Sequence, residues 1–234
     1  MNLLHRGLLI LLALASTAAV EAPPPPGYLA VVCVPSHGGS ATFIATFPPD
    51  ANYPHGVSYL LSCAHLLEDG GAAKPIVLHA PAPGGAKSPV RCQPRFIAFD
   101  TVVDLSLMRM DHGPVPNVAP VAPRNHSIAS RAISCGYDQM RWPGRREPVT
   151  IFRVTPTELW SREKPIPGRS GGGLLDPETG QLIGVCLARI DVKSDPTAGR
   201  GIYCSLEAIH HFLEGKGYGW LVPRGQAAAG SKPV

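Results

Sequence analysis

Apolar residues recur along the chain in short stretches that are separated by clusters of turn-forming residues. In the first half the stretches cover residues 28–34, 41–47, 57–61, 76–79, 90–99 and 105–110. Pro-Pro-Asp at 48–50 and Asp-Gly-Gly at 69–71 are typical of the turns that separate strands. Each stretch has the length of one β-strand, so the pattern predicts a sheet of short strands.

The second half repeats this organisation after a proline-rich segment at residues 112–123, which we interpret as a connection. Further strands are predicted at residues 128–135, 149–158, 173–175, 182–190 and 201–205. Leu206, Ile209 and Leu213 have helical spacing and predict a helix at residues 206–214. The chain is therefore expected to be all-β, with two similar halves and a short C-terminal helix.

Composition and charge agree with this interpretation. The 234 residues include 25 glycines and 26 prolines, and aromatic residues make up 6%, which favours short strands and turns over long helices. The net charge is +4 without a run of Lys or Arg, so we do not expect nucleic-acid binding.

The N-terminus has the pattern of an export signal. His5 and Arg6 precede an apolar run at 7–14 and small residues at 15–19, which predicts a signal peptide within residues 1–22. The run is too short to span a bilayer comfortably, although an uncleaved anchor stays an alternative. A secreted or periplasmic protein without stable membrane insertion is expected. A stiff polyproline spacer follows at 23–26, and residues 223–234 are predicted to be a disordered tail.

Six cysteines follow the signal segment, and their even number permits up to three disulfides in an oxidising compartment. Buried free thiols are the alternative. No pair has C-x-x-C spacing, so we expect neither a metal site nor a cofactor. The six are Cys33, Cys63, Cys92, Cys135, Cys186 and Cys204.

Ser170 lies in the glycine-rich sequence Gly-Arg-Ser-Gly-Gly-Gly at residues 168–173. A serine nucleophile needs a base, a group that orients the base, and N–H donors for the oxyanion. Glycines allow the tight turn that aims backbone N–H groups inward, and those of Gly168 and Ser170 are the candidate donors. The alternative is a glycine-rich surface turn.

His65 and Asp104 supply the other two groups. His65 follows an apolar strand and small residues, and histidine is the usual general base because its pKa lies near neutrality. Asp104 interrupts an apolar run between Val103 and Leu105, where an acid needs a partner such as a histidine N–H. Either residue alone also fits a structural position without a catalytic role.

The order His65, Asp104, Ser170 is that of chymotrypsin-like enzymes. With these residues the chain resembles the trypsin-like (chymotrypsin-fold) serine peptidases, in the style of bacterial secreted and HtrA-like members without a PDZ domain. The motifs that carry the resemblance are Ser-Cys-Ala-His at 62–65, Asp-Leu-Ser-Leu at 104–107, Gly-Arg-Ser-Gly-Gly at 168–172, Gly-Ser-Ala-Thr-Phe-Ile at 39–44 and Gly-Ile-Tyr at 201–203.

The resemblance implies two antiparallel six-stranded β-barrels, at residues 28–122 and 123–222, with the site between them. It implies a serine endopeptidase that acts through an acyl-enzyme, with His65, Asp104 and Ser170 as the triad. A polypeptide substrate would add as a strand along Leu187, Ala188 and Arg189.

The sequence indicates less about the pocket that determines substrate specificity. By resemblance, Lys164, Arg189 and Gly201 approach it, and the two cations suggest acceptance of acidic or polar side chains. The alternative is that both cations point to solvent and the pocket takes small aliphatic residues.

The chain also departs from the family pattern. Arg169 stands where zymogen-activated members have an acid that pairs with a freed N-terminal amine, and an I-V-G-G start is missing. We therefore expect no activation by N-terminal cleavage, with Arg169 either exposed or paired elsewhere. Leu187 replaces a serine that contacts the triad aspartate in many members.

Two other functions compete with the peptidase. An α/β-hydrolase esterase could use Ser170 with Asp195 and His210, but its nucleophile must enter a helix, and the glycines and Pro177 after Ser170 disfavour one. A peptidase-like binding module with a degenerate site is the non-enzymatic alternative.

Overall fold

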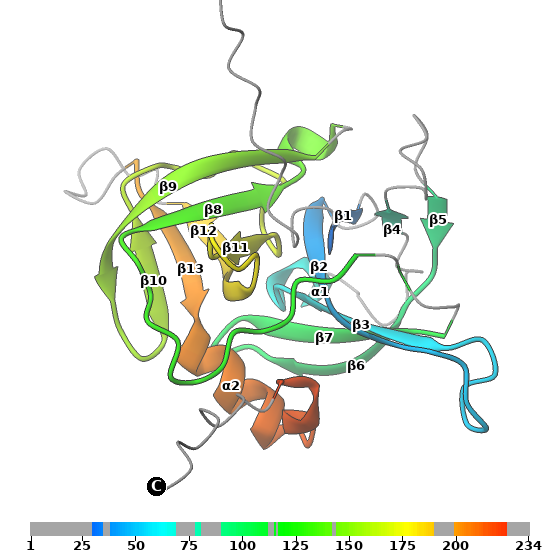
Figure 1. Ribbon diagram of the computed structural model, residues 1–234. Coiled ribbons are helices and arrows are strands. Elements are labelled where there is room, and N and C mark those ends of the chain that lie inside the picture. The colour runs from blue at the N-terminus through cyan, green and yellow to red at the C-terminus, as the bar shows by residue number, and fades with distance from the viewer. Residues whose placement is uncertain are drawn as a thin grey trace, which may run out of the picture.

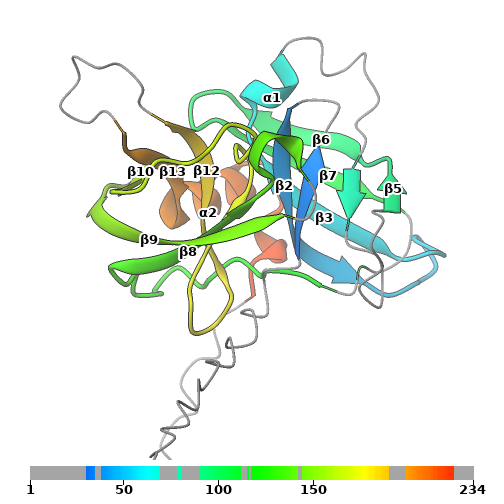
Figure 2. The same ribbon diagram turned by 90° about the horizontal axis from the view of Figure 1, so that it is seen from above.

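The computed structural model describes residues 30–34, 38–68, 78–80, 90–111, 115, 117–141, 144–189 and 199–223. The expected signal segment, the polyproline spacer, Asp195 and the tail from residue 224 lie outside this part. Two β-sheets lie side by side, and a C-terminal helix crosses beneath them in the first view (Figures 1 and 2).

The first sheet has seven strands in the order β5-β4-β1-β2-β3-β7-β6, and every ladder is antiparallel. Its strands are β1 (Val31–Val34), β2 (Gly39–Phe47), β3 (Val57–Ser62), β4 (Leu78–Ala80), β5 (Val90–Cys92), β6 (Arg95–Asp100) and β7 (Leu105–Met110).

A closed six-stranded barrel in this half is not confirmed, because the predicted strand at 90–99 is two strands. Pro94 has no N–H for a ladder, and strand pairing stops at residues 93–94. These two residues carry the chain from one edge strand, β5, to the other, β6. So short a link spans about 10 Å at most, which requires the sheet to curl until its edges approach each other.

The second sheet is a closed antiparallel barrel of six strands in the order β10-β13-β12-β11-β8-β9, as expected for this half. Its strands are β8 (Arg131–Gly136), β9 (Arg145–Val154), β10 (Glu158–Ser161), β11 (Gly173–Leu175), β12 (Leu182–Arg189) and β13 (Gly201–Ser205). The single strand predicted at 149–158 is wrong. Thr155 closes a turn there, since its N–H donates to the Glu158 carbonyl at 2.8 Å.

The proline-rich connection is more than a surface crossing. Ala119 donates its N–H to the Phe43 carbonyl at 2.8 Å, and Ala122 donates to the Leu182 carbonyl at 2.9 Å. Ala119, Val121 and Ala122 are fully buried. The connection therefore forms part of the interior between the two sheets.

The helix α2 (Leu206–Gly215) is capped by Ser205, whose hydroxyl accepts the Ala208 N–H, and it packs on β12 and β13. After it, the short helix η5 (Gly219–Leu221) brings Trp220 against Tyr59 and Phe47 of the first sheet, with ring centroids 5.4 and 5.6 Å apart. The C-terminal segment therefore contacts both halves (Figure 1). None of the helices in the described ranges is long and apolar enough to cross a membrane.

Four cysteines, namely Cys63, Cys135, Cys186 and Cys204, are buried free thiols. The side chains of Cys33 and Cys92 lie outside the described part. Burial raises the pKa of Cys135 and of Cys186 to about 12, so both thiols are uncharged near neutral pH. Of the up to three disulfides that the sequence permits, none involves these four cysteines, which fit the alternative of buried free thiols.

Replacing Leu159 by alanine tests the packing of the closed barrel. Leu159 is fully buried in β10, so Leu159→Ala should lower the free energy of unfolding by roughly 2–5 kcal/mol through lost contacts and a cavity. Val154→Ala in the neighbouring β9 is the control: Val154 is half-exposed, and the loss should be less than about 1 kcal/mol. If urea unfolding showed that both variants lose the same free energy of unfolding, this packing of Leu159 would be contradicted.

Candidate active site

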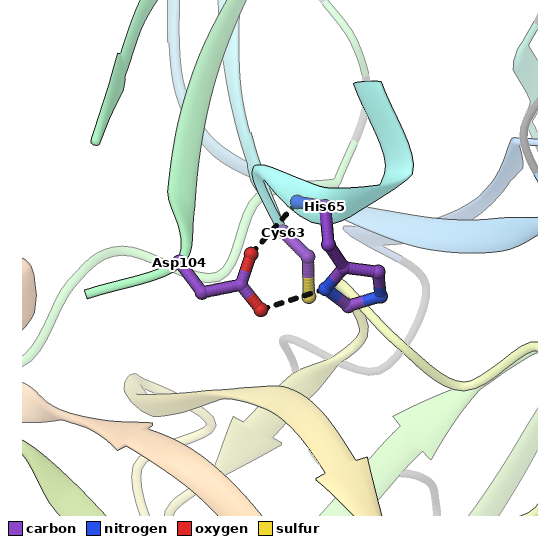
Figure 3. A group of neighbouring side chains, drawn as sticks. All are labelled: Cys63, His65 and Asp104. Atoms are coloured by element: carbon purple, nitrogen blue, oxygen red, sulfur yellow. Dashed lines mark hydrogen bonds and ion pairs between the residues drawn. The ribbon is translucent and has the colours of Figure 1, made fainter. Parts of the chain in front are cut away.

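His65 and Asp104 meet at adjacent ends of two paired strands of the first sheet. His65 begins the short helix α1 (His65–Glu68) after β3, and Asp104 precedes β7. The His65 backbone N–H donates to Oδ1 of Asp104 at 2.8 Å, and Nδ1 of its ring lies 2.7 Å from Oδ2 (Figure 3). Asp104 has a φ of +53°, a left-handed conformation that aspartate tolerates better than most residues. One carboxylate therefore fixes both the backbone and the ring of His65.

Cys63 lies beside this pair, and its sulfur is within 4.8 Å of a ring nitrogen of His65 and of a carboxylate oxygen of Asp104 (Figure 3). Its thiol is fully buried and donates a hydrogen bond to the Cys186 carbonyl at 2.9 Å. Burial, and secondarily the charge of Asp104, raise the pKa of Cys63 well above its usual range. Because a metal binds thiolate rather than thiol, the cluster suits hydrogen bonding better than metal binding.

Ser170 belongs to the segment between β10 and β11, and residues 166–172 are called the Ser170 loop below. Its hydroxyl donates to the Leu187 carbonyl at 3.1 Å, and its own carbonyl accepts the Ser40 N–H at 2.7 Å. Gly171 donates to the Cys186 carbonyl at 2.7 Å. The loop is therefore bonded both to its own barrel and to the first sheet.

Gly168 has a φ of +95°, and a Cβ there would collide with Met140 and the backbone of Tyr137. Glycine is the residue that fits this conformation and this space. Within the described ranges, neither the Gly168 N–H nor the Ser170 N–H donates to another protein group. Both predicted oxyanion donors are therefore available to a ligand.

A cavity of about 480 Å³ brings the three predicted triad residues together. His65, Asp104 and Ser170 all line it, and Gly168 and Leu187 do so as well. The remaining lining residues are Gly38, Leu66, Pro165, Ile166, Pro167 and Cys186.

The other predicted substrate residues lie around this cavity rather than in its lining. Lys164 is exposed, and buried Gly201 packs near Pro165, which does line the cavity. Ala188 and Arg189 pair with Ile202 and Gly201 in the barrel, and their side chains lie outside the described part.

Ser40 is a site residue that the sequence did not reveal. It is fully buried in β2, and its hydroxyl donates to the Gly168 carbonyl and accepts the Tyr137 N–H, both at 2.9 Å. Its carbonyl accepts the Ser62 hydroxyl at 2.7 Å. A serine at the start of an apolar stretch was the available signal, but an exposed strand end has the same pattern.

Arg169, expected to be exposed or paired elsewhere, is paired. Only 1% of its side chain is exposed. Its guanidinium contacts Asp138 at 2.6 Å and Glu147 at 2.9 Å.

Of the residues of the alternative esterase, His210 does not line the cavity that contains Ser170, and Asp195 lies outside the described residues. His210 is buried in α2, and its Nε2 lies 2.9 Å from the Ala122 carbonyl. Residues Gly173–Leu175 after Ser170 form strand β11, whereas a nucleophile elbow continues into a helix. The α/β-hydrolase hypothesis is therefore wrong, because it requires a helix directly after the nucleophile and the chain forms a strand there.

Residues 39–185, more than half of the chain, match the family described as the trypsin-like peptidase domain. The chain belongs to this family of trypsin-like peptidases. No functionally curated protein is detectably similar to it in sequence.

Solved structures of peptidases share the fold of this trypsin-like chain. The Rv3671c protease in an inactive form has 18% identity and a TM-score of 0.58, over 82% of this chain and 90% of that one. The serine endoprotease from Yersinia pestis has 17% identity and a TM-score of 0.61, over 82% of this chain and 64% of that one. A serine-to-alanine mutant of Rv3671c from M. tuberculosis H37Rv, in an inactive form, has 18% identity and a TM-score of 0.59. The match covers 91% of this chain and 98% of that one.

Removing the Ser40 hydroxyl should destabilise this trypsin-like domain. Ser40→Ala removes the hydrogen bonds that the Ser40 hydroxyl makes with the Gly168 carbonyl and the Tyr137 N–H, at a cost of roughly 1–3 kcal/mol. Ser130→Ala, at an exposed serine, should change the free energy of unfolding by less than about 0.5 kcal/mol. Urea unfolding of both variants measures the difference, and a neutral Ser40→Ala would show that these bonds do not matter.

Proposed function

We propose that the protein is a serine endopeptidase that hydrolyses peptide bonds through Ser170, His65 and Asp104. The observation that carries the proposal is the 2.7 Å contact between His65 and Asp104 beside Ser170 in one cavity. The unpartnered N–H groups of Gly168 and Ser170 add the donors that acyl transfer needs.

In the proposed reaction the Ser170 hydroxyl turns from the Leu187 carbonyl to Nε2 of His65 and attacks the scissile carbonyl carbon. His65 takes the hydroxyl proton, and Asp104 stabilises the imidazolium that forms. The N–H groups of Gly168 and Ser170 bind the oxyanion of the tetrahedral intermediate. His65 then protonates the leaving amine, which leaves an acyl-enzyme. Water attacks the acyl-enzyme by the same route and releases Ser170.

The proposed substrate is a polypeptide that pairs with residues 187–189 of β12. The lining of the cavity includes the apolar residues Pro165, Ile166, Pro167 and Leu187, which favours an aliphatic side chain before the cleaved bond. We also propose that the protein is secreted or periplasmic, on the basis of the signal-like pattern at residues 1–22.

Replacing Ser170 by alanine should abolish the activity. Wild-type protein should be labelled by a fluorophosphonate and should cleave denatured casein, whereas Ser170→Ala should do neither, with kcat lower by about 10⁴-fold or more. Labelling of wild type without proteolysis would point to an esterase instead. Neither labelling nor proteolysis would favour the degenerate binding module.

A peptide library tests the specificity of the cavity. We expect cleavage mainly after small or medium aliphatic residues, because the lining next to Ser170 is apolar. Preferred cleavage after Asp or Glu would instead assign a role to Lys164 or Arg189. Preferred cleavage after Arg or Lys would contradict both the aliphatic and the acidic specificity, because a cationic side chain needs an acid at the base of its pocket.

A further inference from the structure

We propose that Asp138 and Glu147 are positioning residues that hold the Ser170 loop in its oxyanion-binding shape through the buried guanidinium of Arg169. The inference rests on the proposed function, because it concerns the donors of that same site. Neither acid lines the cavity, and both would act through Arg169.

Arg169 forms a bidentate pair with Asp138 that is largely removed from water, and a single hydrogen bond with Glu147. Nε donates to Oδ1 of Asp138 at 2.8 Å, and one terminal nitrogen donates to Oδ2 at 2.6 Å. The other terminal nitrogen donates to Glu147 at 2.9 Å. Asp138 is 8% exposed and Glu147 is 40% exposed in their side chains, so the pair with Asp138 is the more shielded from solvent.

The guanidinium stays charged in this position. Burial lowers the pKa of Arg169, but the hydrogen bonds and charges of Asp138 and Glu147 outweigh burial and raise it above its usual range. A buried cation that loses an acid partner is strongly unfavourable and is driven toward water. Its backbone joins Gly168 to Ser170, so such a movement would displace both oxyanion donors.

The segment that carries Asp138 also contacts the loop directly. Gln139 donates its N–H to the Pro167 carbonyl at 2.6 Å. Gln139 and Met140 have φ angles of +51° and +60°, an uncommon conformation that surrounding contacts must maintain. Because Gly168 packs against Met140, residues 137–140 and the Ser170 loop form one unit.

The described partners of this ion pair, Asp138 and Glu147, both belong to the second half. Within the described residues, the ion pair that shapes the loop therefore joins the β8–β9 connection to the Ser170 loop, and Ser40 adds its hydrogen bonds from the first sheet. Some family members have an acid before the serine, which pairs with a cationic amine. In this chain the charges of the pair are exchanged, because the cation lies in the loop and the acids lie around it.

Isosteric amides test the two acids. Asp138→Asn should lower kcat by about 10- to 100-fold and Glu147→Gln by less, with KM changed by less than about threefold, because oxyanion stabilisation acts on the transition state. Glu214→Gln is the control, since Glu214 forms an exposed ion pair with one terminal nitrogen of Arg124, away from the Ser170 loop. It should leave kcat and KM unchanged.

Charge exchange separates a specific ion pair from general damage. Asp138→Arg places two cations together, and Arg169→Asp places a third carboxylate beside Asp138 and Glu147. Each single variant should therefore be almost inactive. The double variant restores opposite charges and should have kcat at least about tenfold above the better single variant. A double variant no better than either single would overturn the ion pair as the positioning device.

Amide hydrogen exchange gives a readout that does not need activity. In the Ser170→Ala background, Asp138→Asn should speed exchange within residues 166–172, and Glu214→Gln should not. Glu147→Gln supplies the test if Asp138→Asn fails to fold, because Glu147 is half-exposed. Unchanged exchange together with unchanged kcat would overturn the inference. A wild type that is neither labelled nor proteolytic would defeat the proposed function alone, and exchange would still decide whether the acids hold the loop.

Discussion

The hydrogen bonds of Ser40 are the interaction on which the rest of the site depends. Its amide binds the Ser170 carbonyl, and its hydroxyl joins the Gly168 carbonyl to the Tyr137 N–H. A serine on the first sheet thus determines where the carbonyls of a loop on the second barrel point. Ser40 thereby connects the Ser170 loop to β2, and the Gly168 and Ser170 residues that it holds both line the cavity.

The Ser170 loop is supported from two sides by different forces. Neutral hydrogen bonds connect it to β2 across the junction of the two sheets, and a buried ion pair connects it to the β8–β9 segment within its own barrel. The first support places the loop relative to His65, because β2 pairs with β3, the strand that leads to His65. The second sets the local shape of the loop. Together they give a site assembled from both halves a fixed geometry.

Local sequence patterns predicted what depends on neighbouring residues. Strands 173–175 and 201–205 agree with β11 and β13, and the spacing of Leu206, Ile209 and Leu213 located α2. The order of His65, Asp104 and Ser170 identified residues that do share one cavity. Local patterns failed where one residue changed the path of the chain, as Pro94 and Thr155 do. They also could not identify the partners of Ser40 and Arg169, because pairs such as Asp138 with Arg169 are set by the fold and not by spacing along the chain.

The packing of Trp220 on Tyr59 and Phe47 has a consequence for the order of events during synthesis. These aromatic rings come from opposite ends of the described chain, so the first sheet keeps an unfilled apolar surface until the C-terminal segment has left the ribosome. The aromatic contact that joins the C-terminal segment to the first sheet can therefore form only after residue 220 has been synthesised.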